Sequence, residues 1–472
     1  MDFTILFFGF ERRLNQFMKH ANDMTKGSPL KALVLFALPI ILGNLFQQFY
    51  NLMDIAIVGN RLGDYSLSAV GATSALYGLF LSLAHGSANG FSIVIARHFG
   101  ARDTEGLKRA IAHTLKQTVG LALLLTALAI FATKPLLVLL QTPDVELSYR
   151  YISVVLFAVS VTVLYNVLSG ILRAVGNSLA PLLFLIIGAL SNIGMDWLFV
   201  CVFDFGVLGA GLATVLAQVL SCTLTGLYLI KKCKAILPSR EHFAADSALS
   251  KDLFQNALSM AMMFSIVSIG SVSLQFAVNS LGSDIVAAHT TARKIDETMM
   301  VMFAPLSTAC ATFCSQNYGA GRFDRIKKGI LTAFALSFGI SVVAIAATFF
   351  FGDYFVKAVS GSENPIVLSN GALYLKLNLP FYFFLVALVL LRSTLQALGH
   401  KVAPLIASGV EMIGKISIAF ILVPEINYMG IIVSEPIIWV TCSFIVIANF
   451  LMVYKKRDDV VASFPKRLSK AS

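Results

Sequence analysis

Residues 32–58 read ALVLFALPIILGNLFQQFYNLMDIAIV, and this stretch decides the fold. Its only charged residue is Asp54, which lies about six helical turns from the start of the run. An α-helix needs roughly 20 consecutive apolar residues to cross a bilayer, so this run is long enough to span one. The stretch therefore predicts a transmembrane helix that carries a carboxyl group inside the membrane.

Similar apolar runs recur along the whole chain, and turn-forming residues such as Gly59-Asn60 separate them. They lie at 66–96, 114–133, 148–172, 180–203, 206–230, 255–281, 284–314, 329–352, 365–391, 403–423 and 428–454. The 472 residues are 57% hydrophobic and 13% charged, and a soluble fold has too little interior to bury that much apolar surface. This composition excludes a soluble enzyme, a disordered chain and a disulfide scaffold. It predicts an all-α membrane protein with twelve transmembrane helices.

The basic residues are distributed unevenly between the loops. The net charge of +11 comes from 36 Lys and Arg against 25 Asp and Glu. If the N-terminus is cytoplasmic, only Arg61, Lys134 and Lys357 of the basic loop residues fall outside the cell. Cytoplasmic loops are the ones enriched in Lys and Arg, so we expect both termini in the cytoplasm. The positive charge then determines topology, and no nucleic-acid partner is expected.

The two halves of the chain repeat each other. Residues 97–101 (RHFGA) recur as 316–320 (QNYGA), and residues 173–177 (RAVGN) recur as 396–400 (QALGH). Each half has six spans, an even number, so the halves insert in the same orientation and form two lobes related by a pseudo-two-fold axis along the membrane normal. The expected organisation is a cytoplasmic tail at 1–30, an N-lobe at 31–230, a cytoplasmic linker at 231–251, a C-lobe at 252–454 and a basic cytoplasmic tail at 455–472.

Two carboxylates stand out in the N-lobe, because neither Asp54 nor Asp196 has an Arg or Lys at helical spacing in its own span. Asn192 precedes Asp196 by four residues, so both face the same side of a helix. A buried, unpaired carboxylate takes up a proton or holds a cation. Together with Thr214, these residues offer the oxygens that Na+ requires, and the acids alone suit H+. The alternative is that both acids hydrogen-bond locally and only hold helices together.

The order of several short motifs makes the chain similar to one family. The motifs are Pro39, residues 47–54 (QQFYNLMD), Gly59, the 173–177 turn, residues 192–196 (NIGMD) and residues 209–214 (GAGLAT). Across nearly its whole length the chain resembles the multidrug and toxic compound extrusion (MATE) family, in the bacterial branch with the cation site in the N-lobe.

The resemblance implies two six-helix bundles arranged as a V and a monomer in the bacterial cytoplasmic (inner) membrane. It also implies that the positions of Asp54, Asn192, Asp196 and Thr214 form the N-lobe ion site, as they do in relatives.

Other polar residues of the N-lobe are candidates for supporting roles. Gln47, Tyr50 and Asn166 are expected to line a substrate cavity in this lobe, with interhelical hydrogen bonding as the alternative. Pro39 lies fifteen residues before Asp54 and interrupts the hydrogen bonding of its span. We expect the helix to bend there when Asp54 changes state, and a static kink is the alternative.

The second half has no acid at the positions that match the two N-lobe carboxylates. It carries instead Glu411 and Lys415 four residues apart, and Arg293 and Glu297 at the same spacing. These are expected to be neutralising pairs, because pairing is how intramembrane charges are tolerated. The alternative is that Glu297 or Glu411 contacts a cationic substrate or a second ion. Glu435 is expected near the outer interface.

The sequence lacks Walker, HExxH, GxSxG and CxxC motifs, which argues against ATP-driven transport and membrane proteolysis. No enzyme activity and no cofactor are expected beyond the coupling ion, Na+ or H+. The expected function is secondary active efflux of organic, mostly lipophilic cationic small molecules by alternating access. The alternative within transport is a lipid-linked saccharide flippase of the same superfamily, which would need a large cationic cavity. A receptor or scaffold that transports nothing would not need lone intramembrane acids.

Overall fold

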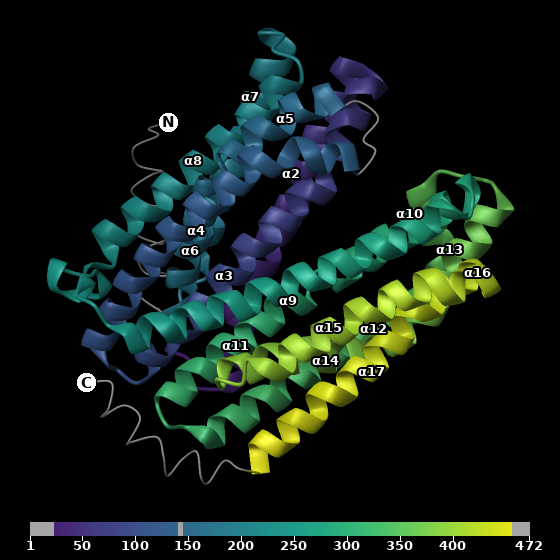
Figure 1. Cartoon of the computed structure of the whole chain (residues 1–472). Helices are drawn as coiled ribbons and strands as arrows, with labels where there is room; N and C mark the ends of the chain where they lie inside the picture. The colour runs from purple at the N-terminus through teal and green to yellow at the C-terminus, as the bar shows by residue number, and fades with distance from the viewer. Residues whose placement is uncertain (1–22, 140–144, 456–472) are drawn as a thin grey trace, which may run out of the picture. The chain divides into compact units, whose positions relative to one another are not determined.

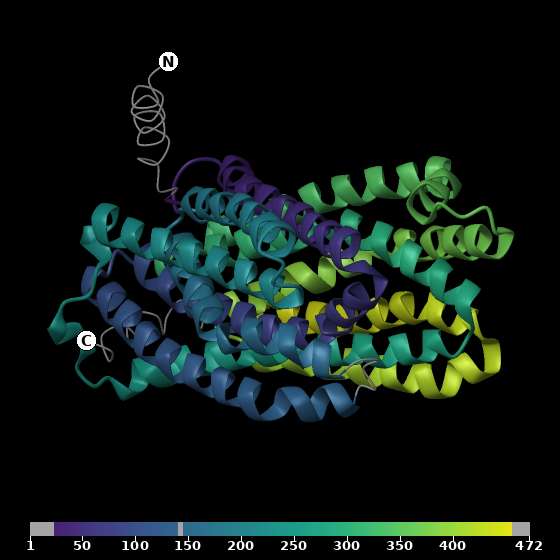
Figure 2. The same ribbon diagram turned by 90° about the horizontal axis from the view of Figure 1, so that it is seen from above.

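The computed structural model describes residues 23–139 and 145–455 of the chain. Over this part of the chain, Figures 1 and 2 show helices joined by loops, without strands. Eleven helices are long and apolar enough to cross a membrane, and a twelfth span results if Val145–Phe157 and Val159–Ala174, bent by 42°, count as one. The all-α fold class is therefore confirmed. Most of the expected tails, at 1–22 and 456–472, lie outside the described residues.

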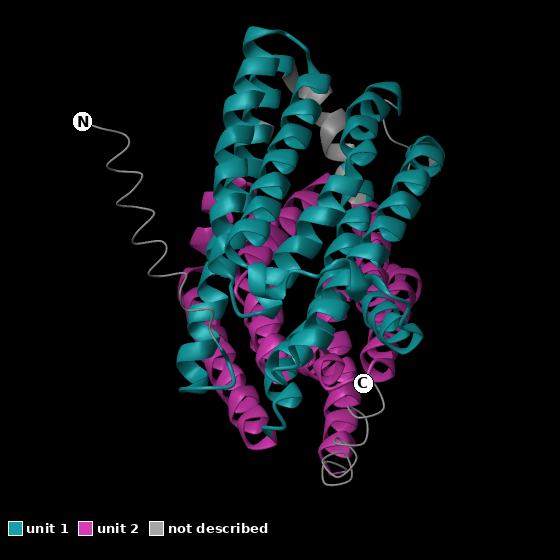
Figure 3. Cartoon of the chain, turned by 90° about the vertical axis from the view of Figure 1, so that its left-hand side faces the viewer, with its two compact units in different colours: residues 1–257, 315–322 teal, residues 258–314, 323–472 magenta. Residues whose placement is uncertain are grey.

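The helices divide into two compact units, drawn in teal and magenta in Figure 3. Unit 1 comprises Met1–Ala257 and Ser315–Arg322. Its helices are α2 (Pro29–Ala72), α3 (Ser74–Gly100), α4 (Thr104–Leu139), α5 (Val145–Phe157), α6 (Val159–Ala174), α7 (Leu179–Asp196), the π-helix η1 (Trp197–Val202), α8 (Val207–Lys232) and the short 3₁₀ helices η2 (Lys234–Ile236) and η3 (Arg240–Phe243).

The turn predicted at Gly59-Asn60 is wrong. Helix α2 continues through both residues to Ala72, and the break before α3 falls at Thr73. A glycine inside a helix costs only about 1 kcal/mol, and a chain in the bilayer retains every internal hydrogen bond it can. The membrane environment therefore overrides this local turn signal.

Unit 2 comprises Leu258–Cys314 and Phe323–Ser472. It contains most of α9 (Ser247–Asn279) and of α11 (Phe303–Gly319), with α10 (Ser283–Met300), α12 (Phe323–Ser360), α13 (Pro365–Asn378), the 3₁₀ helix η4 (Leu379–Phe381), α14 (Tyr382–Ala397), α15 (Val402–Ser417), the π-helix η5 (Ile418–Leu422), α16 (Val423–Ile426) and α17 (Tyr428–Lys455). Asn364 starts α13 by accepting a hydrogen bond from the Ile366 amide at 2.9 Å, with Pro365 in the first turn.

The repeat seen in the sequence is also a repeat of backbone geometry. Gly176 ends the turn after α6 with φ 88°, and Gly399 ends the turn after α14 with φ 90°. In both turns the next amide reaches back to close the helix, from Asn177 at 2.9 Å and from His400 at 2.8 Å. Only glycine adopts this left-handed conformation without strain, which explains why both copies have it.

The last turn of α11 returns the chain to unit 1, where it packs tightly against the last turn of α3. A Cβ added at Gly100 would lie 1.9 Å from the carbonyl oxygen of Gln316, and one at Gly319 would lie 1.9 Å from that of Arg97. These are matching positions of the repeat, so the two copies meet backbone to backbone. Met24, fully buried, is held there by a 3.0 Å hydrogen bond from its amide to Gln316.

Candidate functional site

Asp196 lies at a change of helix type in unit 1. It is the last residue of α7, and the π-helix η1 follows directly. Such π-helical turns occur frequently at functional sites. Helix α7 packs against α2, which carries Asp54, and the two carboxyl groups are close enough to interact electrostatically. The structure therefore brings together the two acids that the sequence singled out.

The polar atoms of this acid pair lack partners within the protein. Both carboxylate oxygens of Asp196, both amide atoms of Asn192 and Oδ1 of Asp54 are buried without a hydrogen bond to any described residue. Asp196 is 0% exposed and Asn192 is 2% exposed. Nearly all buried polar groups are hydrogen-bonded, because an unpaired one costs about 1–3 kcal/mol. This cluster of orphaned atoms is what a site completed by a proton or a cation would have.

The available ligand atoms suit Na+ or H+. Two carboxylates and the Asn192 carbonyl are hard oxygen ligands, and among the residues that the structure describes no group of three or more His, Cys, Asp and Glu could hold a metal ion. Thr214 lies on α8, which packs against α7, and its hydroxyl donates to the Ala210 carbonyl at 3.1 Å. This bond uses the hydroxyl proton, and the part of Thr214 in the acid site stays a prediction.

The expected cavity residues fall into two groups. Gln47 hydrogen-bonds the hydroxyl of Tyr50, and Tyr50 interacts electrostatically with Asp54, so both lie beside the acid site. Asn166 is different: its side-chain amide donates to the Thr162 carbonyl of its own helix at 2.8 Å, and the residue is 4% exposed. The side-chain amide of Asn166 is therefore engaged in a hydrogen bond within its own helix.

Two residues near this group were missed by sequence reasoning. Gln218 on α8 accepts a hydrogen bond from the Thr162 hydroxyl and donates one to the Tyr77 hydroxyl at 3.1 Å. Tyr77 also interacts electrostatically with Tyr50. The only signal in the sequence was the presence of polar side chains within apolar runs, which does not reveal which helices they join.

Pro39 lies inside α2, with helix on both sides of it. Because proline has no backbone N–H, the carbonyl one turn earlier lacks its usual partner, and the helix is easier to deform there. Whether it bends together with Asp54 stays a prediction.

Unit 2 contains a connected set of charged side chains. Both pairs expected from the sequence are present, Arg293–Glu297 at 3.6 Å and Lys415–Glu411 at 3.2 Å. Glu411 also binds Arg392 on α14, with 2.7 Å between Oε2 and the guanidinium. Arg392 was overlooked in the sequence, since it lies at the end of an apolar run and its partner is on another helix.

Glu435 joins the two pairs into one network, and its expected place near the outer interface stays a prediction. It is 7% exposed on α17 and lies 3.4 Å from Lys415 and 3.9 Å from Arg293. Arg293 also binds Asp296 at 3.1 Å, and Asp296 accepts a 2.5 Å hydrogen bond from Tyr382. Pairing across helices keeps Glu435 buried, and helical spacing within one span could not reveal it.

The two units thus share a helical repeat but differ in their charges: one has orphaned acids and the other has paired ones. Two repeats of membrane helices, one of which contains a buried, incomplete acid site, are typical of a secondary transporter. The family described as MatE matches residues 39–198 and 259–421, more than half of the chain. The chain belongs to this family.

Individual relatives are similar over most of their length. The chain is 28% identical to the probable multidrug resistance protein YpnP of Bacillus subtilis, over 82% of this chain and 86% of YpnP. It is 20% identical to the multidrug export protein MepA of Staphylococcus aureus, over 92% of this chain and 95% of MepA. Among solved structures, a MOP superfamily transporter from Pyrococcus furiosus matches with a TM-score of 0.85 and 25% identity, over 92% of this chain and 97% of that one.

Proposed function

We propose that this chain exports organic compounds across the bacterial cytoplasmic membrane in exchange for Na+ or H+ bound between Asp54 and Asp196. The observation that carries the proposal is the group of orphaned polar atoms on α2 and α7, which a monovalent cation or protons would satisfy. The names of YpnP and MepA support the substrate class, multidrug compounds. The distribution of Lys and Arg supports an orientation with both termini in the cytoplasm.

The ion drives transport by changing the charge of the acid site. Ion binding neutralises Asp54 and Asp196, which lowers the cost of burying them and stabilises one conformation of unit 1. Pro39 supplies the position at which α2 deforms as this change occurs. Substrate and ion bind to different conformations, so the inward movement of one is coupled to the outward movement of the other.

The test uses purified protein in sealed vesicles and a fluorescent organic cation such as ethidium. A Na+ gradient and a pH gradient are imposed separately, and dye movement is compared between the wild type and Asp54→Asn. Movement under one gradient that disappears in Asp54→Asn supports the proposal and identifies the ion. Movement against the dye gradient that persists in Asp54→Asn would overturn the ion site.

A matched control separates loss of the site from loss of a carboxylate in general. Asp353 on α12 is an acid whose side chain is 74% exposed and pairs with Lys376 at 3.0 Å. Asp353→Asn should therefore transport dye at the wild-type rate. If neither gradient moves dye in the wild type, the multidrug assignment fails, and flipping of a lipid-linked saccharide becomes the next activity to assay.

A further inference from the structure

The acid site of unit 1 has a polar side and an apolar side. Residues four positions apart on a helix lie one above the other on the same face. Four positions from Asp54, Asp196 and Thr214 in one direction are the polar residues Tyr50, Asn192 and Gln218. Four positions in the other direction are Val58, Val200 and Ala210. The count reverses on α8 because this helix follows η1 through the short loop 203–206 and packs back against α7.

The apolar side of the acid site is closed. Val58, Val200, Val207 and Ala210 form one cluster, the apolar layer, and each of them is 0–7% exposed. Tyr151 on α5 packs against this layer and also interacts electrostatically with both acids, so the layer lies directly beside the acid site. Apolar constrictions exclude water and ions, because neither finds a polar partner in them.

An exposed ion pair lies beyond the apolar layer. Arg61 on α2 and Asp204 in the loop after η1 are 3.8 Å apart, and their side chains are 52% and 74% exposed. Charges this exposed keep their hydration, so water reaches the far side of the layer. Arg61 follows Asp54 by seven residues, which at 1.5 Å per residue is about 10 Å along the helix. The layer is therefore what separates the orphaned acids from this water.

The polar side of the acid site is more accessible. Asp54, Tyr50 and Gln218 are each partly exposed, in contrast to the buried apolar layer. Gln218 also hydrogen-bonds Thr162 and Tyr77, so polar groups continue away from the acids on this side. Amide and hydroxyl groups offer hydrogen bonds to water and oxygen ligands to a passing cation.

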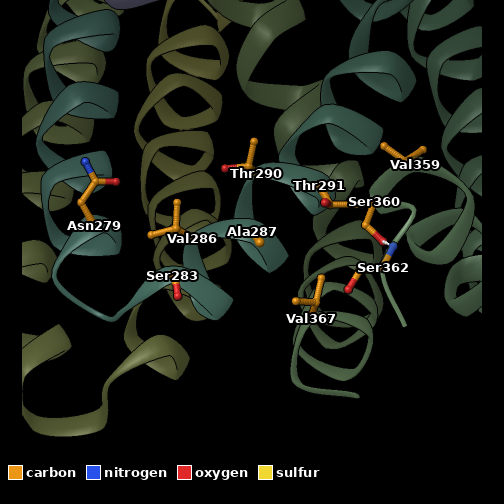
Figure 4. Close-up of a pocket in the computed structure, with 10 residues that line it drawn as sticks. All are labelled: Asn279, Ser283, Val286, Ala287, Thr290, Thr291, Val359, Ser360, Ser362 and Val367. Atoms are coloured by element: carbon orange, nitrogen blue, oxygen red, sulfur yellow. Dashed lines mark hydrogen bonds between the residues drawn. The ribbon is translucent and has the colours of Figure 1, made fainter. Parts of the chain in front are cut away.

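Unit 2 is open at the matching end. Asn279 follows Asn60 by 219 residues, the offset between residues 97–101 and 316–320. It lines a depression of about 630 Å³ together with Ser283 and Thr290 on α10, and Figure 4 shows their side chains. Hydroxyl and amide groups of this kind bind water. The closed layer of unit 1 is therefore not a general requirement of the repeat.

We propose that the apolar layer seals the acid site on this side, so that the coupling ion enters and leaves only past Tyr50 and Gln218. A site open on both sides would let ions run through it without moving any substrate. With a single opening, the ion reaches the other side of the membrane only when unit 1 changes conformation, which is the condition for exchange. The inference rests on the proposed export function and adds the path of the ion to it.

The test measures ion leak in sealed vesicles that contain purified protein and no dye substrate. A trapped indicator of pH or Na+ follows the collapse of an imposed gradient for the wild type and for a double variant, Val58→Ser with Val200→Ser. The two hydroxyls give water hydrogen-bonding partners inside the layer, so we expect the gradient to collapse about tenfold faster than in the wild type. Adding Asp54→Asn should abolish this excess leak, because the ion passes through the acid site.

The control is Val167→Ser, at a residue that is 1% exposed in another core cluster of unit 1, and its gradient should collapse at the wild-type rate. If the double variant does not fold, Val200→Thr, which keeps the shape of valine and adds one hydroxyl, decides by the same criterion. The proposal is overturned if a folded variant of the layer leaks no faster than the wild type, or if the excess leak persists with Asp54→Asn. Wild-type protein that moves no dye would contradict the export function and leave this result standing, since the leak is measured without dye.

Discussion

The two units differ in how their buried charges are balanced at matching positions of the repeat. In unit 1, Asn192 and Asp196 end α7 just before a π-helix, and their polar atoms have no partner among the described residues. When the repeat is continued from the 396–400 turn, the matching residues of unit 2 are Lys415, near the end of α15, and Ala419, inside the π-helix η5 that follows. The ammonium of Lys415 lies 3.2 Å from Glu411 and 3.4 Å from Glu435. Unit 2 thus has a covalently attached cation where unit 1 has an incomplete site.

This difference indicates which half responds to ions. A lysine cannot leave its site, so the charge balance of unit 2 does not follow the ion concentration outside it. In the proposed mechanism the acids of unit 1 are balanced only while an ion is bound, so the stability of this unit should depend on the ion concentration. Under the proposed mechanism an ion gradient therefore acts on unit 1, and variants that give one unit the charge arrangement of the other test this comparison directly.

The largest effect is expected from Asp196→Asn in unit 1. Gradient-driven dye transport should fall to the level of empty vesicles, because the neutral amide cannot gain or lose the coupling charge. Thermal stability in detergent should not fall, because the substitution removes a buried charge that has no partner. Loss of both folding and transport would instead mean that Asp196 is structural.

The next largest effect is a loss of thermal stability, expected from Lys415→Met in unit 2. Removing the ammonium leaves Glu411 and Glu435 short of positive charge in a buried site, and breaking such a pair costs about 3–5 kcal/mol. The variant should unfold at a clearly lower temperature than the wild type. A double variant, Lys415→Met with Glu435→Gln, should recover part of that loss, and failure to recover any would show that the two charges are not coupled.

Much of this contrast between the units was predictable from the sequence, except for the pairs that join different helices. Apolar runs predicted the spans, and spacing within a span predicted the Glu411–Lys415 pair. Asp54 and Asp196 stood out because they lack such a partner. Glu435 and Arg392 could not be assigned in this way, because their partners lie on other helices and no local pattern encodes which side chains meet. The turn at Gly59-Asn60 failed for the opposite reason, since a local signal was overridden by the membrane.

A smaller effect, on ion-dependent stability, is expected from a variant that gives unit 1 its own fixed cation. Asn192→Lys places an ammonium one turn from Asp196, as Lys415 lies one turn from Glu411. Binding of an ion at a concentration of one hundred times its Kd stabilises the wild type by about 2.7 kcal/mol. The variant should lose this stabilisation by Na+ or low pH in thermal unfolding, while Asn370→Lys serves as the control, because Asn370 lies on α13 of unit 2 and bonds only the Ile366 carbonyl of its own helix. Ion-dependent stability that survives in Asn192→Lys would place the ion elsewhere.

The smallest effect concerns the turns after α3 and α11, where the two copies again differ. In unit 1, Asp103 caps α4 by accepting the Gly106 amide at 2.8 Å and pairs with His98 at 2.9 Å, and the hydrogen bond from His98 lowers the pKa of the Asp103 carboxyl. The matching residue of the repeat is Arg322, which donates to the Thr25 carbonyl at 3.1 Å. Removing the cap with Asp103→Ala should cost about 1 kcal/mol at neutral pH.

The pH dependence of that loss follows from the direction of the shift. Because the folded pKa of Asp103 lies below its unfolded value of about 3.9, the ionised carboxyl stabilises the fold above that value. This contribution disappears as the pH falls through the folded pKa. The unfolding temperatures of wild type and Asp103→Ala should therefore converge in acid, whereas those of wild type and Arg322→Ala should differ by the same amount throughout, since arginine stays charged. If the difference in unfolding temperature between wild type and Asp103→Ala is the same at every pH, the charge of the carboxyl does not contribute to the cap.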